Sequence, residues 1–287
     1  MKHFNLFSQN SFPLKVLLNH HSIVGLHDHD FYELVLVISG EGLHISGEER
    51  HPISAGDIFL IKPGNPHGYE GEHHFSVYNI LYLPEKLALP RFDLAQEPGF
   101  RAFFELAPEL RRQFGFRKHF RLGKTQLDEF ALLSERIKQE LESSQSGHYF
   151  RAVTLFMRLI ERVSHACGNS AVYRENDALL RLGTVVTFME QHQAESLTIK
   201  ELADRAAMSP ATLNRAFRRA VGKSPLNYLN ELRIANAEQL LLANPALSIA
   251  EIALRCGFSD SNYFSRLFKK RTNRTPRAFR KDNKGCL

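Results

Sequence analysis

A segment of this chain is repeated, and the repeat limits the possible folds of the C-terminal third more than any other feature. Residues 197–203 read Leu-Thr-Ile-Lys-Glu-Leu-Ala, and residues 247–253 read Leu-Ser-Ile-Ala-Glu-Ile-Ala. Each copy is followed by a turn of small residues and by a second segment whose apolar residues recur at helical spacing. A short helix, a tight turn and a second amphipathic helix form a helix-turn-helix. The sequence therefore predicts two such units.

The second segments of the two copies correspond position by position. In the first, Ser209-Pro210 is typical of a helix N-cap followed by proline, and Leu213 and Phe217 share one helical face. In the second, one inserted residue shifts the matching apolar pair to Phe264 and Phe268. Cationic residues recur in both segments: Arg215, Arg218 and Arg219 in the first, and Arg266, Lys269 and Lys270 in the second. Each second helix is expected to bury one face and to present cations on the other.

A linking helix is expected between the two copies. Apolar residues recur at helical spacing after Pro225, and Asn244-Pro245 ends the run. These apolar residues are Tyr228, Leu232, Ala235, Leu240 and Leu241. A helix of roughly 18 residues spans on the order of 27 Å, which is close to the ~34 Å repeat of B-DNA. Two units separated in this way could enter successive major-groove segments and read two adjacent half-sites.

Charge and histidine are distributed unevenly along the chain. The formal net charge is +6, and residues 175–287 contain 18 Lys and Arg against 11 Asp and Glu. By contrast, 13 of the 14 histidines lie before residue 175. A basic C-terminal part fits contact with phosphates, although a solvated basic face or a nucleic-acid binder without sequence preference would carry the same charge. The histidine-rich part offers groups that bind ligands or metals.

The sequence lacks the signals of several other protein classes. It has no apolar run of the length that a signal peptide or a membrane span needs. Its three cysteines, Cys167, Cys256 and Cys286, have neither the spacing of a zinc site nor the density of a disulfide scaffold. We therefore expect a cytoplasmic protein that does not bind membranes. No serine-histidine-acid order, phosphate-binding glycine loop or dinucleotide fingerprint is present to indicate an enzyme of those kinds.

The second copy of the repeat also resembles a known family. Residues 249–253, together with residues 257–269, Gly-Phe-Ser-Asp-Ser-Asn-Tyr-Phe-Ser-Arg-Leu-Phe-Lys, are similar to the signature of AraC-family transcription regulators. The resemblance implies sequence-specific binding of double-stranded DNA, with RNA polymerase as a further partner. It implies base contacts from Ala211, Thr212, Asn214, Arg215, Ser261, Asn262, Ser265 and Arg266. Arginine suits guanine and asparagine suits adenine, and the remaining cations, Arg218, Arg219, Lys269 and Lys270, suit phosphates. Any one of these side chains could instead simply face solvent.

The N-terminal half has the pattern of short strands. Residues 31–38, 43–46 and 58–61 are apolar runs separated by glycine-rich and proline-rich turns, which favours a barrel or jelly roll. The spacing His27-x-His29-x3-Glu33-x6-Gly40 resembles the first motif of the cupin barrels. Residues 56–67 resemble the second motif, although Gly71 stands where that motif usually ends in asparagine.

The cupin resemblance leaves three interpretations of the barrel open. In cupin enzymes the residues matching His27, His29, Glu33 and His67 bind a transition metal, and alternation along one strand would point the first three inward. The same groups could line a small-molecule pocket or form a structural polar core. We expect an effector pocket without a cofactor or metal, lined by these four residues and Tyr69. The order of elements resembles the rhamnose-responsive regulators of the AraC family, which favours a sugar as effector.

Two amphipathic helices are expected between the barrel and the basic part. They cover Leu127 to Leu141 and Ala152 to Val163, separated by a loop at residues 143–147. The family resemblance implies that they form a homodimer, although they could merely pack on their own barrel. Residues 87–121, rich in phenylalanine and turn residues, fit no single element.

Together these patterns predict an α+β chain. Residues 1–95 form a cupin-like (jelly-roll) β-barrel that senses an effector, residues 96–170 a helical dimerisation segment, and residues 171–287 an all-α DNA-binding domain with two helix-turn-helix units. The expected function is that of a DNA-binding transcription regulator, an activator controlled by a small molecule, rather than an enzyme. The alternative is a cupin-type metalloenzyme module fused to a DNA-binding domain.

Overall fold

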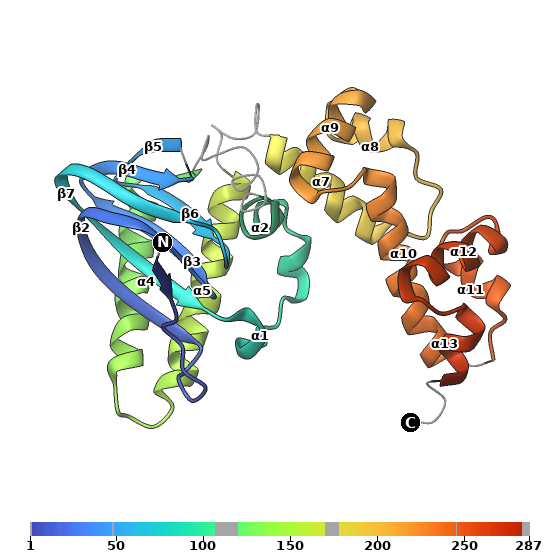
Figure 1. The fold of residues 1–287 in the computed structure, drawn as a ribbon, viewed down its shortest axis with the longest axis horizontal. Coiled ribbons are helices and arrows are strands. Elements are labelled where there is room, and N and C mark those ends of the chain that lie inside the picture. The colour runs from blue at the N-terminus through green and yellow to red at the C-terminus, as the bar shows by residue number, and fades with distance from the viewer. Residues whose placement is uncertain (1, 48, 107–119, 170–177, 245, 283–287) are drawn as a thin grey trace. The chain divides into compact units, whose positions relative to one another are not determined.

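The computed structural model describes residues 2–47, 49–106, 120–169, 178–244 and 246–282. The chain divides into two compact units, Met1–Gly183 and Thr184–Leu287, which are described separately below (Figure 1).

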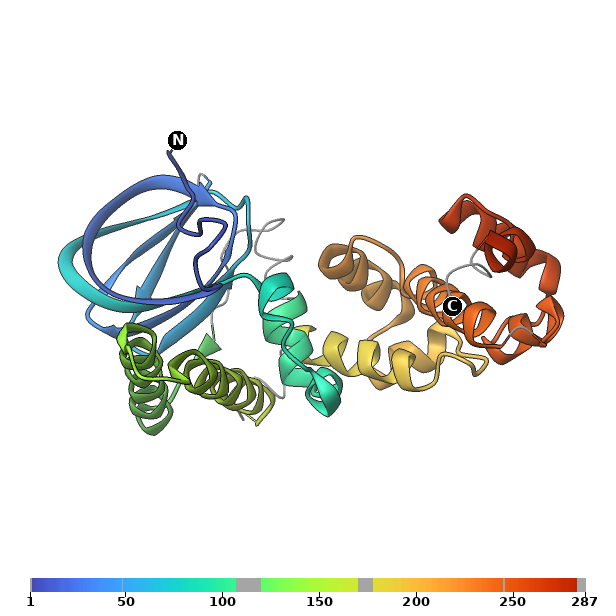
Figure 2. The same cartoon turned by 90° about the horizontal axis from the view of Figure 1, so that it is seen from below.

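Unit 1 contains an eight-stranded sheet that curls into a barrel, and this confirms the predicted β-barrel (Figure 2). The strand order is β1-β2-β7-β3-β6-β8, with β4 paired to β5 and β7. The strands are β1 (Lys2–Phe4), β2 (Leu14–His29), β3 (Tyr32–Ser39), β4 (Glu41–Ser46), β5 (Glu49–Ser54), β6 (Asp57–Ile61), β7 (His67–Tyr82) and β8 (Phe120–Arg121).

Two long strands, β2 and β7, hold the barrel together. They run antiparallel from the pair Leu14 and Tyr82 to the pair His27 and His67, with register shifts on either side of residues 23–24. Such irregularities bend a strand and increase its twist, which lets one strand serve two parts of a sheet. The first part of β7 pairs with β4 and the second with β3. A Cβ atom on Gly68 would lie 2.6 Å from the carbonyl oxygen of Val24, so only glycine permits the close approach of β7 to β2.

Strand β3 is buried on both faces, and this explains its unbroken apolar run. Val35 and Val37 point into the barrel, where they pack with Phe59 and Phe75. Leu34 and Leu36 point outward into a second cluster that includes residues of α4 (Lys124–Glu142) and α5 (His148–Asn169). Strands covered on both faces lose the alternation of polar and apolar residues that a half-exposed strand shows.

Helices α4 and α5 form the predicted helical pair and cover one side of the barrel (Figure 2). Their apolar stripes are buried against the barrel of the same chain: Phe130, Leu133 and Ile137 on α4, and Phe156, Leu159 and Val163 on α5. The ring of Phe156 lies 5.1 Å from that of Tyr82, and the hydroxyl of Tyr78 donates a 2.9 Å hydrogen bond to Glu135. The helices therefore touch the outer face of the strands whose inner face lines the barrel.

Up to residue 106, the segment that the sequence left unassigned consists of short helical turns, and its last two residues form β8. The turns are α1 (Pro84–Leu87), η1 (Phe92–Gln96), α2 (Pro98–Phe100) and a π-helical turn, η2 (Arg101–Leu106). Residues 107–119 lie outside the described part of the chain. The backbone at Gly99 lies directly against α5, since a Cβ there would be 2.0 Å from the carbonyl oxygen of Ser164.

Unit 2 is all-helical and contains the two predicted helix-turn-helix units. After α7 (Ala178–Gln191), which begins in unit 1, the first is α8 (Ile199–Arg205) with α9 (Pro210–Val221), and the second is α11 (Ile249–Arg255) with α12 (Ser261–Thr272). Helix α10 (Pro225–Ala243) links them, and α13 (Pro276–Asp282) follows. Thr198 with Glu201 caps α8 as Ser248 with Glu251 caps α11, so the repeat in sequence is a repeat in capping chemistry.

The linking helix forms as predicted, but of the five apolar residues whose spacing indicated it only Leu241 is fully buried. Its buried apolar residues are Leu229, Ile234, Ala237 and Leu241, whereas Ala235 is exposed and Leu232 only partly buried. The physical reason is that α10 contacts α9 on the first unit and α11, α12 and α13 on the second, so its apolar surface is not a single stripe.

Candidate functional site

The second helix of each unit has a side-chain cap at its N-terminus and one buried face. Ser209 caps α9 by accepting a hydrogen bond from the backbone nitrogen of Thr212 at 3.2 Å. Asp260 caps α12 in the same way through the nitrogen of Asn262 at 2.8 Å. The buried faces carry the apolar pairs predicted from the repeat, Leu213 with Phe217 and Phe264 with Phe268. With that face fixed, the opposite side of each helix is left to solvent.

The residues predicted to read bases lie on these open faces. Ala211, Arg215, Asn262 and Arg266 are exposed, and Thr212, Asn214, Ser261 and Ser265 are partly exposed. Asn214 donates a 3.1 Å hydrogen bond to the carbonyl oxygen of Pro210, so its amide is held against its own helix. The predicted phosphate contacts, Arg218, Arg219, Lys269 and Lys270, are all exposed near the C-terminal ends of the same helices.

A polar cluster between α10 and α12 was not anticipated from the sequence. The amide of Asn230 donates to the hydroxyl of Tyr263 at 3.3 Å, and Glu231 forms ion pairs with Lys223 at 2.6 Å and Arg271 at 3.3 Å. Glu231 thereby joins the end of the first unit to the end of α12. The excess of cations over acids in the C-terminal part indicated that an acidic residue there would find cationic partners. Periodicity did not indicate that Glu231 would bridge two of these cations.

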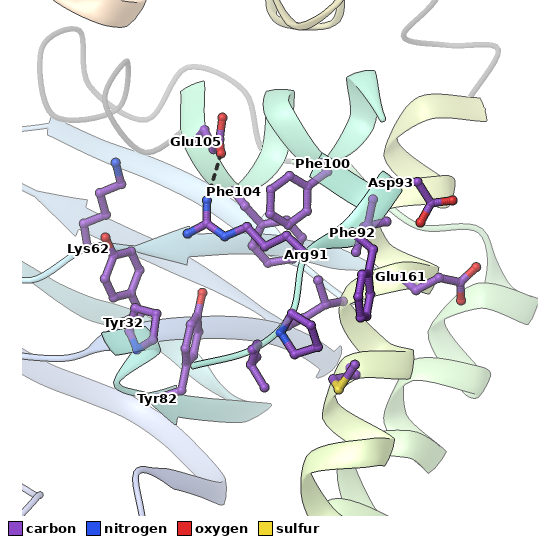
Figure 3. A pocket seen from close by; sticks show the side chains of 16 residues that line it. Tyr32, Lys62, Tyr82, Arg91, Phe92, Asp93, Phe100, Phe104, Glu105 and Glu161 are labelled. Carbon is purple, nitrogen blue, oxygen red and sulfur yellow. Dashed lines mark hydrogen bonds and ion pairs between the residues drawn. The ribbon is translucent and has the colours of Figure 1, made fainter. Parts of the chain in front are cut away.

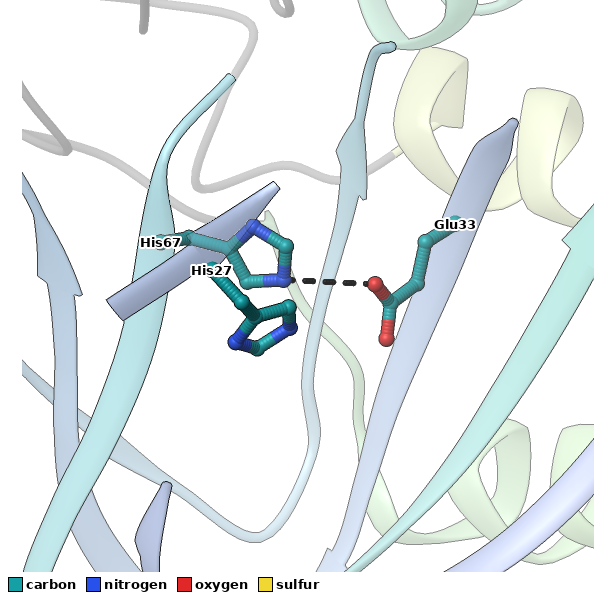
Figure 4. A group of neighbouring side chains, drawn as sticks. All are labelled: His27, Glu33 and His67. Carbon is teal, nitrogen blue, oxygen red and sulfur yellow. Dashed lines mark ion pairs between the residues drawn. The ribbon is translucent and has the colours of Figure 1, made fainter. Parts of the chain in front are cut away.

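The barrel brings four of its predicted site residues together. His27, His29, Glu33 and His67 are at most 8% exposed, and a carboxylate oxygen of Glu33 lies 3.0 Å from Nε2 of His29 and 3.3 Å from Nε2 of His67. Figure 4 shows the rings of His27 and His67 opposite the Glu33 carboxylate. The prediction that residues 27, 29 and 33 share one strand was wrong. The chain turns at residues 30–31, so the two histidines end β2 and Glu33 begins β3.

Hydrogen bonds to the backbone fix which nitrogens of the histidines face the site. Nδ1 of His27 donates to the carbonyl oxygen of Gly25, and Nδ1 of His67 donates to that of Asn65, both at 3.0 Å. Burial, and then the nearby charge of His67, lower the pKa of His27, so its ring is neutral near pH 7. Its Nε2 therefore carries a lone pair. Nε2 of His67 faces a carboxylate, an arrangement that is favourable only with a proton or a cation between the two groups.

Glu33 is the anionic centre of this cluster. Burial alone would raise the pKa of its carboxyl group, but hydrogen bonds from His29 and His67, together with their charges, outweigh burial and lower that pKa. Tyr69 is also buried beside the cluster, where burial and then the charge of Glu33 raise the pKa of its hydroxyl. The cluster thus combines a fixed carboxylate with imidazole and phenol groups.

A cavity of about 230 Å³ adjoins the cluster. Of the five residues predicted to line the pocket, His27, His29, Glu33 and Tyr69 line this cavity and His67 does not. Its polar lining also includes Asn19 and Asn79, which the sequence did not indicate. Apolar side chains complete the wall: Phe4, Leu6, Leu17, Val24, Phe31 and Leu81. A carboxylate, amides and imidazoles beside apolar surface form the type of lining that binds small polar molecules.

Comparisons with known proteins agree with this architecture. Residues 18–160 match the model of the AraC-like ligand binding domain, and residues 202–282 match that of a helix-turn-helix domain. The chain is 30% identical over 262 residues to the HTH-type transcriptional activator RhaS of Escherichia fergusonii, covering 91% of this chain and 89% of that protein. The chain belongs to the AraC family.

Two further relatives of this AraC-family protein illustrate the same relation. It is 32% identical over 254 residues to the HTH-type transcriptional activator RhaR of Enterobacter sp., covering 87% of this chain and 84% of that protein. Among solved structures, the DNA-binding domain of AdpA in complex with a target DNA is 32% identical, with 37% of this chain and 94% of that chain covered and a TM-score of 0.35. The two family matches and the identity to RhaS show that the protein is a DNA-binding transcription regulator with a ligand-binding domain.

The barrel of this AraC-family protein also has the chemistry of a metal site. Ligand atoms of His27, Glu33 and His67 lie within 4.8 Å of one another. Both histidines donate their other nitrogen to a backbone carbonyl, which is the usual support of a metal-bound imidazole. The residues present therefore fit a divalent transition metal. Separately, no helix within the described ranges has the length and apolarity to cross a membrane.

Proposed function

We propose that this protein activates transcription by reading two adjacent DNA half-sites with α9 and α12, under the control of a small molecule bound in the barrel. The observation that carries the proposal is the duplicated helix-turn-helix, in which both second helices bury a matching apolar pair and expose a matching set of cations. A merely basic surface would not need two helices with the same start, the same buried face and arginines at the same positions.

Base readers and phosphate contacts can be separated by substitution. Arg215 on α9 and Arg266 on α12 lie in the middle of their helices and suit the O6 and N7 atoms of guanine. Arg218 and Lys269 lie one turn further on and suit phosphates. We expect Arg215→Ala to relax specificity at one base-pair position, at a cost of about 1–3 kcal/mol, and Arg218→Ala to weaken binding to all sequences alike.

The test compares these two variants on a set of operators that differ at single base pairs, at one fixed salt concentration. A loss with Arg215→Ala that is confined to one position supports direct readout. If Arg215→Ala and Arg218→Ala weaken binding equally for every sequence, α9 does not read bases and the protein binds nucleic acid without sequence preference.

For the effector we propose a sugar, held in the barrel cavity. Glu33, Asn19 and Asn79 offer hydrogen-bonding partners for hydroxyl groups, and the apolar walls suit the face of a sugar ring. A change in the cavity has a short path to the helical pair through β3. Glu33 points into the barrel, while its neighbour Leu34 packs in the cluster that contains α4 and α5. A bound effector would shift the population of barrel and helix arrangements, and thereby DNA affinity.

Linkage makes the effector proposal testable. If the sugar strengthens DNA binding by some factor, DNA must strengthen sugar binding by the same factor. The measurement is calorimetric titration of a panel of sugars into the protein with and without operator DNA, with His29→Ala as the variant expected to lose binding and the exposed Glu85→Ala as control. Equal affinities with and without DNA would contradict positive coupling.

A metal is a second candidate ligand of the barrel, favoured by the lone pair of His27 and by the His67–Glu33 contact at 3.3 Å. His27, Glu33 and His67 would hold the ion, which could act as a Lewis acid toward a bound ligand. Elemental analysis of the purified protein decides between the candidates. One tightly bound metal per chain, lost in His27→Ala, would establish a metal site, whereas a metal-free protein that binds sugar would support the simple effector pocket.

The remaining partners follow from the regulator role. We propose a homodimer in which the outward side of the helical pair meets its copy, because Leu132 on α4 and Phe150 on α5 are 53% and 79% exposed. RNA polymerase is the proposed target of activation, and the cytoplasm is the proposed site of action. We propose that the protein acts as a regulator and not as an enzyme. Size-exclusion chromatography of Phe150→Ser against the wild type tests the dimer.

A further inference from the structure

A second and larger cavity lies outside the barrel, in the segment that fitted no predicted element. It measures about 360 Å³, against about 230 Å³ for the barrel cavity. Its walls come from the outer face of the sheet, from residues 84–105 and from α5. Figure 3 shows the side chains that surround it. All of its lining residues belong to unit 1.

The two sides of this outer cavity differ in chemistry. Apolar side chains form most of its lining, with Phe100, Phe104 and Ile160 among them. The hydroxyls of Tyr32 and Tyr82 and the cations Lys62 and Arg91 lie toward one end, which also holds the carboxylate of Glu105 (Figure 3). Asp93 and Glu161 lie at the other end, beyond the ring of Phe92. A ligand that matches this pattern has an apolar body and a single negative charge at the end near Arg91.

Arg91 is placed to meet such a charge. Its side chain is 61% exposed, and its ion pair with Glu105 is long, at 3.5 Å. Glu105 has a much closer partner in Arg101, at 2.6 Å. The carboxylate of Glu105 is therefore satisfied without Arg91, and the guanidinium can turn to a ligand carboxylate at little cost. Guanidinium groups bind carboxylates through two parallel hydrogen bonds, which is a stronger contact than a single charge pair.

Phe92, at the mouth of the cavity, has a strained backbone and an apolar side chain exposed to water. Its φ of 42° is in the left-handed region and its side chain is 80% exposed. A left-handed backbone is strained at a residue with a side chain, and residues held in such strain occur often at ligand sites. An apolar ligand would cover this ring and remove its contact with water.

The walls of the outer cavity also contact the helix that enters the DNA-binding unit. A Cβ on Gly183 of α7 would lie 2.7 Å from the carbonyl oxygen of Pro98 and 3.3 Å from Cβ of Arg101. Pro98 and the cavity residue Phe100 are the first and last residues of α2. Arg101 forms an ion pair with the cavity residue Glu105. A displacement of this wall would therefore also displace α7 at Gly183. The residues of α7 after Gly183 belong to unit 2.

We propose that the outer cavity is a second ligand site, distinct from the barrel, which takes a small carboxylic acid with an apolar, aromatic or aliphatic body. Arg91 and Lys62 bind its carboxylate, the phenylalanine-lined wall holds its body, and Phe92 covers the entrance. Through α2 and Gly183 the occupied site restrains α7. The protein then integrates two chemical signals, one in the barrel and one in the helical layer.

The test uses phenylbutyrate as probe and the full chain as protein. Because the sequence contains no tryptophan, Phe92→Trp introduces a single tryptophan at the mouth of the outer cavity, whose emission can be excited selectively over that of the eight tyrosines. We expect phenylbutyrate to change its emission saturably. Phenylbutanol, which lacks the charge, should bind at least tenfold more weakly, equivalent to about 1.4 kcal/mol. Calorimetric titration of the wild type, with native Phe92, provides a second measurement that does not depend on the fluorophore.

Three variants locate the site. Arg91→Ala should weaken phenylbutyrate binding at least tenfold. Lys86→Ala, which removes an exposed cation on α1 that does not line the cavity, should leave it unchanged, and so should His29→Ala in the barrel. Equal affinities for the acid and the alcohol, or equal effects of Arg91→Ala and Lys86→Ala, would overturn the proposal, as would no binding at millimolar probe. Loss of binding with His29→Ala alone would place the probe in the barrel and also overturn it.

Discussion

Replacing Gly257 with alanine tests the packing that holds the second helix-turn-helix in place. Gly257 lies in the turn between α11 and α12 with a φ of 83°. A Cβ there would be 2.8 Å from the carbonyl oxygen of Gln193, 2.9 Å from that of Ala194 and 2.9 Å from Nε of Arg233. Arg233 donates hydrogen bonds of 2.7 Å to the carbonyl oxygens of Gln193 and Glu195. An added methyl group would therefore push the loop after α7 away from α10 and strain these bonds.

The size of the effect follows from two contributions. The left-handed backbone costs an alanine roughly 1–2 kcal/mol. Forcing a methyl group into filled space costs roughly 1–3 kcal/mol more. Gly222 supplies the matched control, because its φ is 76° but an added Cβ would have no atom within 4 Å. Gly222→Ala should therefore show the backbone cost alone. We expect the free energy of unfolding to fall by about 2–5 kcal/mol in Gly257→Ala and by about 1–2 kcal/mol in Gly222→Ala.

The assay is urea unfolding of the full chain followed by circular dichroism, with the slope of the transition checked to be the same in each variant. Operator binding should also fall in Gly257→Ala, since the turn positions α12. Ala207 occupies the equivalent turn of the first unit with a φ of 49°. Ala207→Gly should raise the free energy of unfolding by about 1–2 kcal/mol, because it removes the same left-handed backbone cost that Gly222→Ala adds. Equal losses in Gly257→Ala and Gly222→Ala would refute the close approach.

Two ionisable groups give further predictions. Burial, and then the hydrogen bond to Glu135, raise the pKa of Tyr78 to about 12. The stability that the protonated hydroxyl contributes is therefore complete below the ordinary pKa of 10 and is lost as the pH rises toward 12. Tyr78→Phe should remove this part of the alkaline loss, about 1 kcal/mol once solvent screening of the hydroxyl is allowed for, in unfolding measured from pH 8 to 12. An unchanged pH dependence would contradict it. Burial raises the pKa of Cys256 to about 11, so its thiol should resist alkylation at pH 8 until urea unfolds unit 2, as followed by peptide mass spectrometry. Rapid labelling of the native protein at Cys256 would show that this turn is open.

The predictions from sequence succeeded where structure is specified locally. The two helix-turn-helix units follow from caps, turns and apolar pairs within about 25 residues of one another, and each of these features is visible as sequence. Strand β3 and helices α4 and α5 were likewise found from uninterrupted apolar patterns. In each case neighbouring residues carry the whole signal.

The remainder depends on contacts between distant residues. Strands β2 and β7 are long but irregular, and their polar residues, such as Asn19 and Asn79, face a cavity rather than solvent, so alternation does not reveal them. His27 and Glu33 approach each other across a turn between two strands. The short turns at residues 84–106 include a π-helical turn that has no periodicity to detect. Which side of α10 is buried could not be known before both helix-turn-helix units were placed against it.

We propose above all that this AraC-family protein reads a defined DNA sequence under the control of a small molecule. The most direct measurement is selection of bound sites from a random duplex library by the full chain, at fixed salt, with and without a panel of sugars. We expect a motif of two half-sites about one helical turn apart, whose enrichment is changed by one sugar. Recovery of duplexes without sequence preference would contradict it.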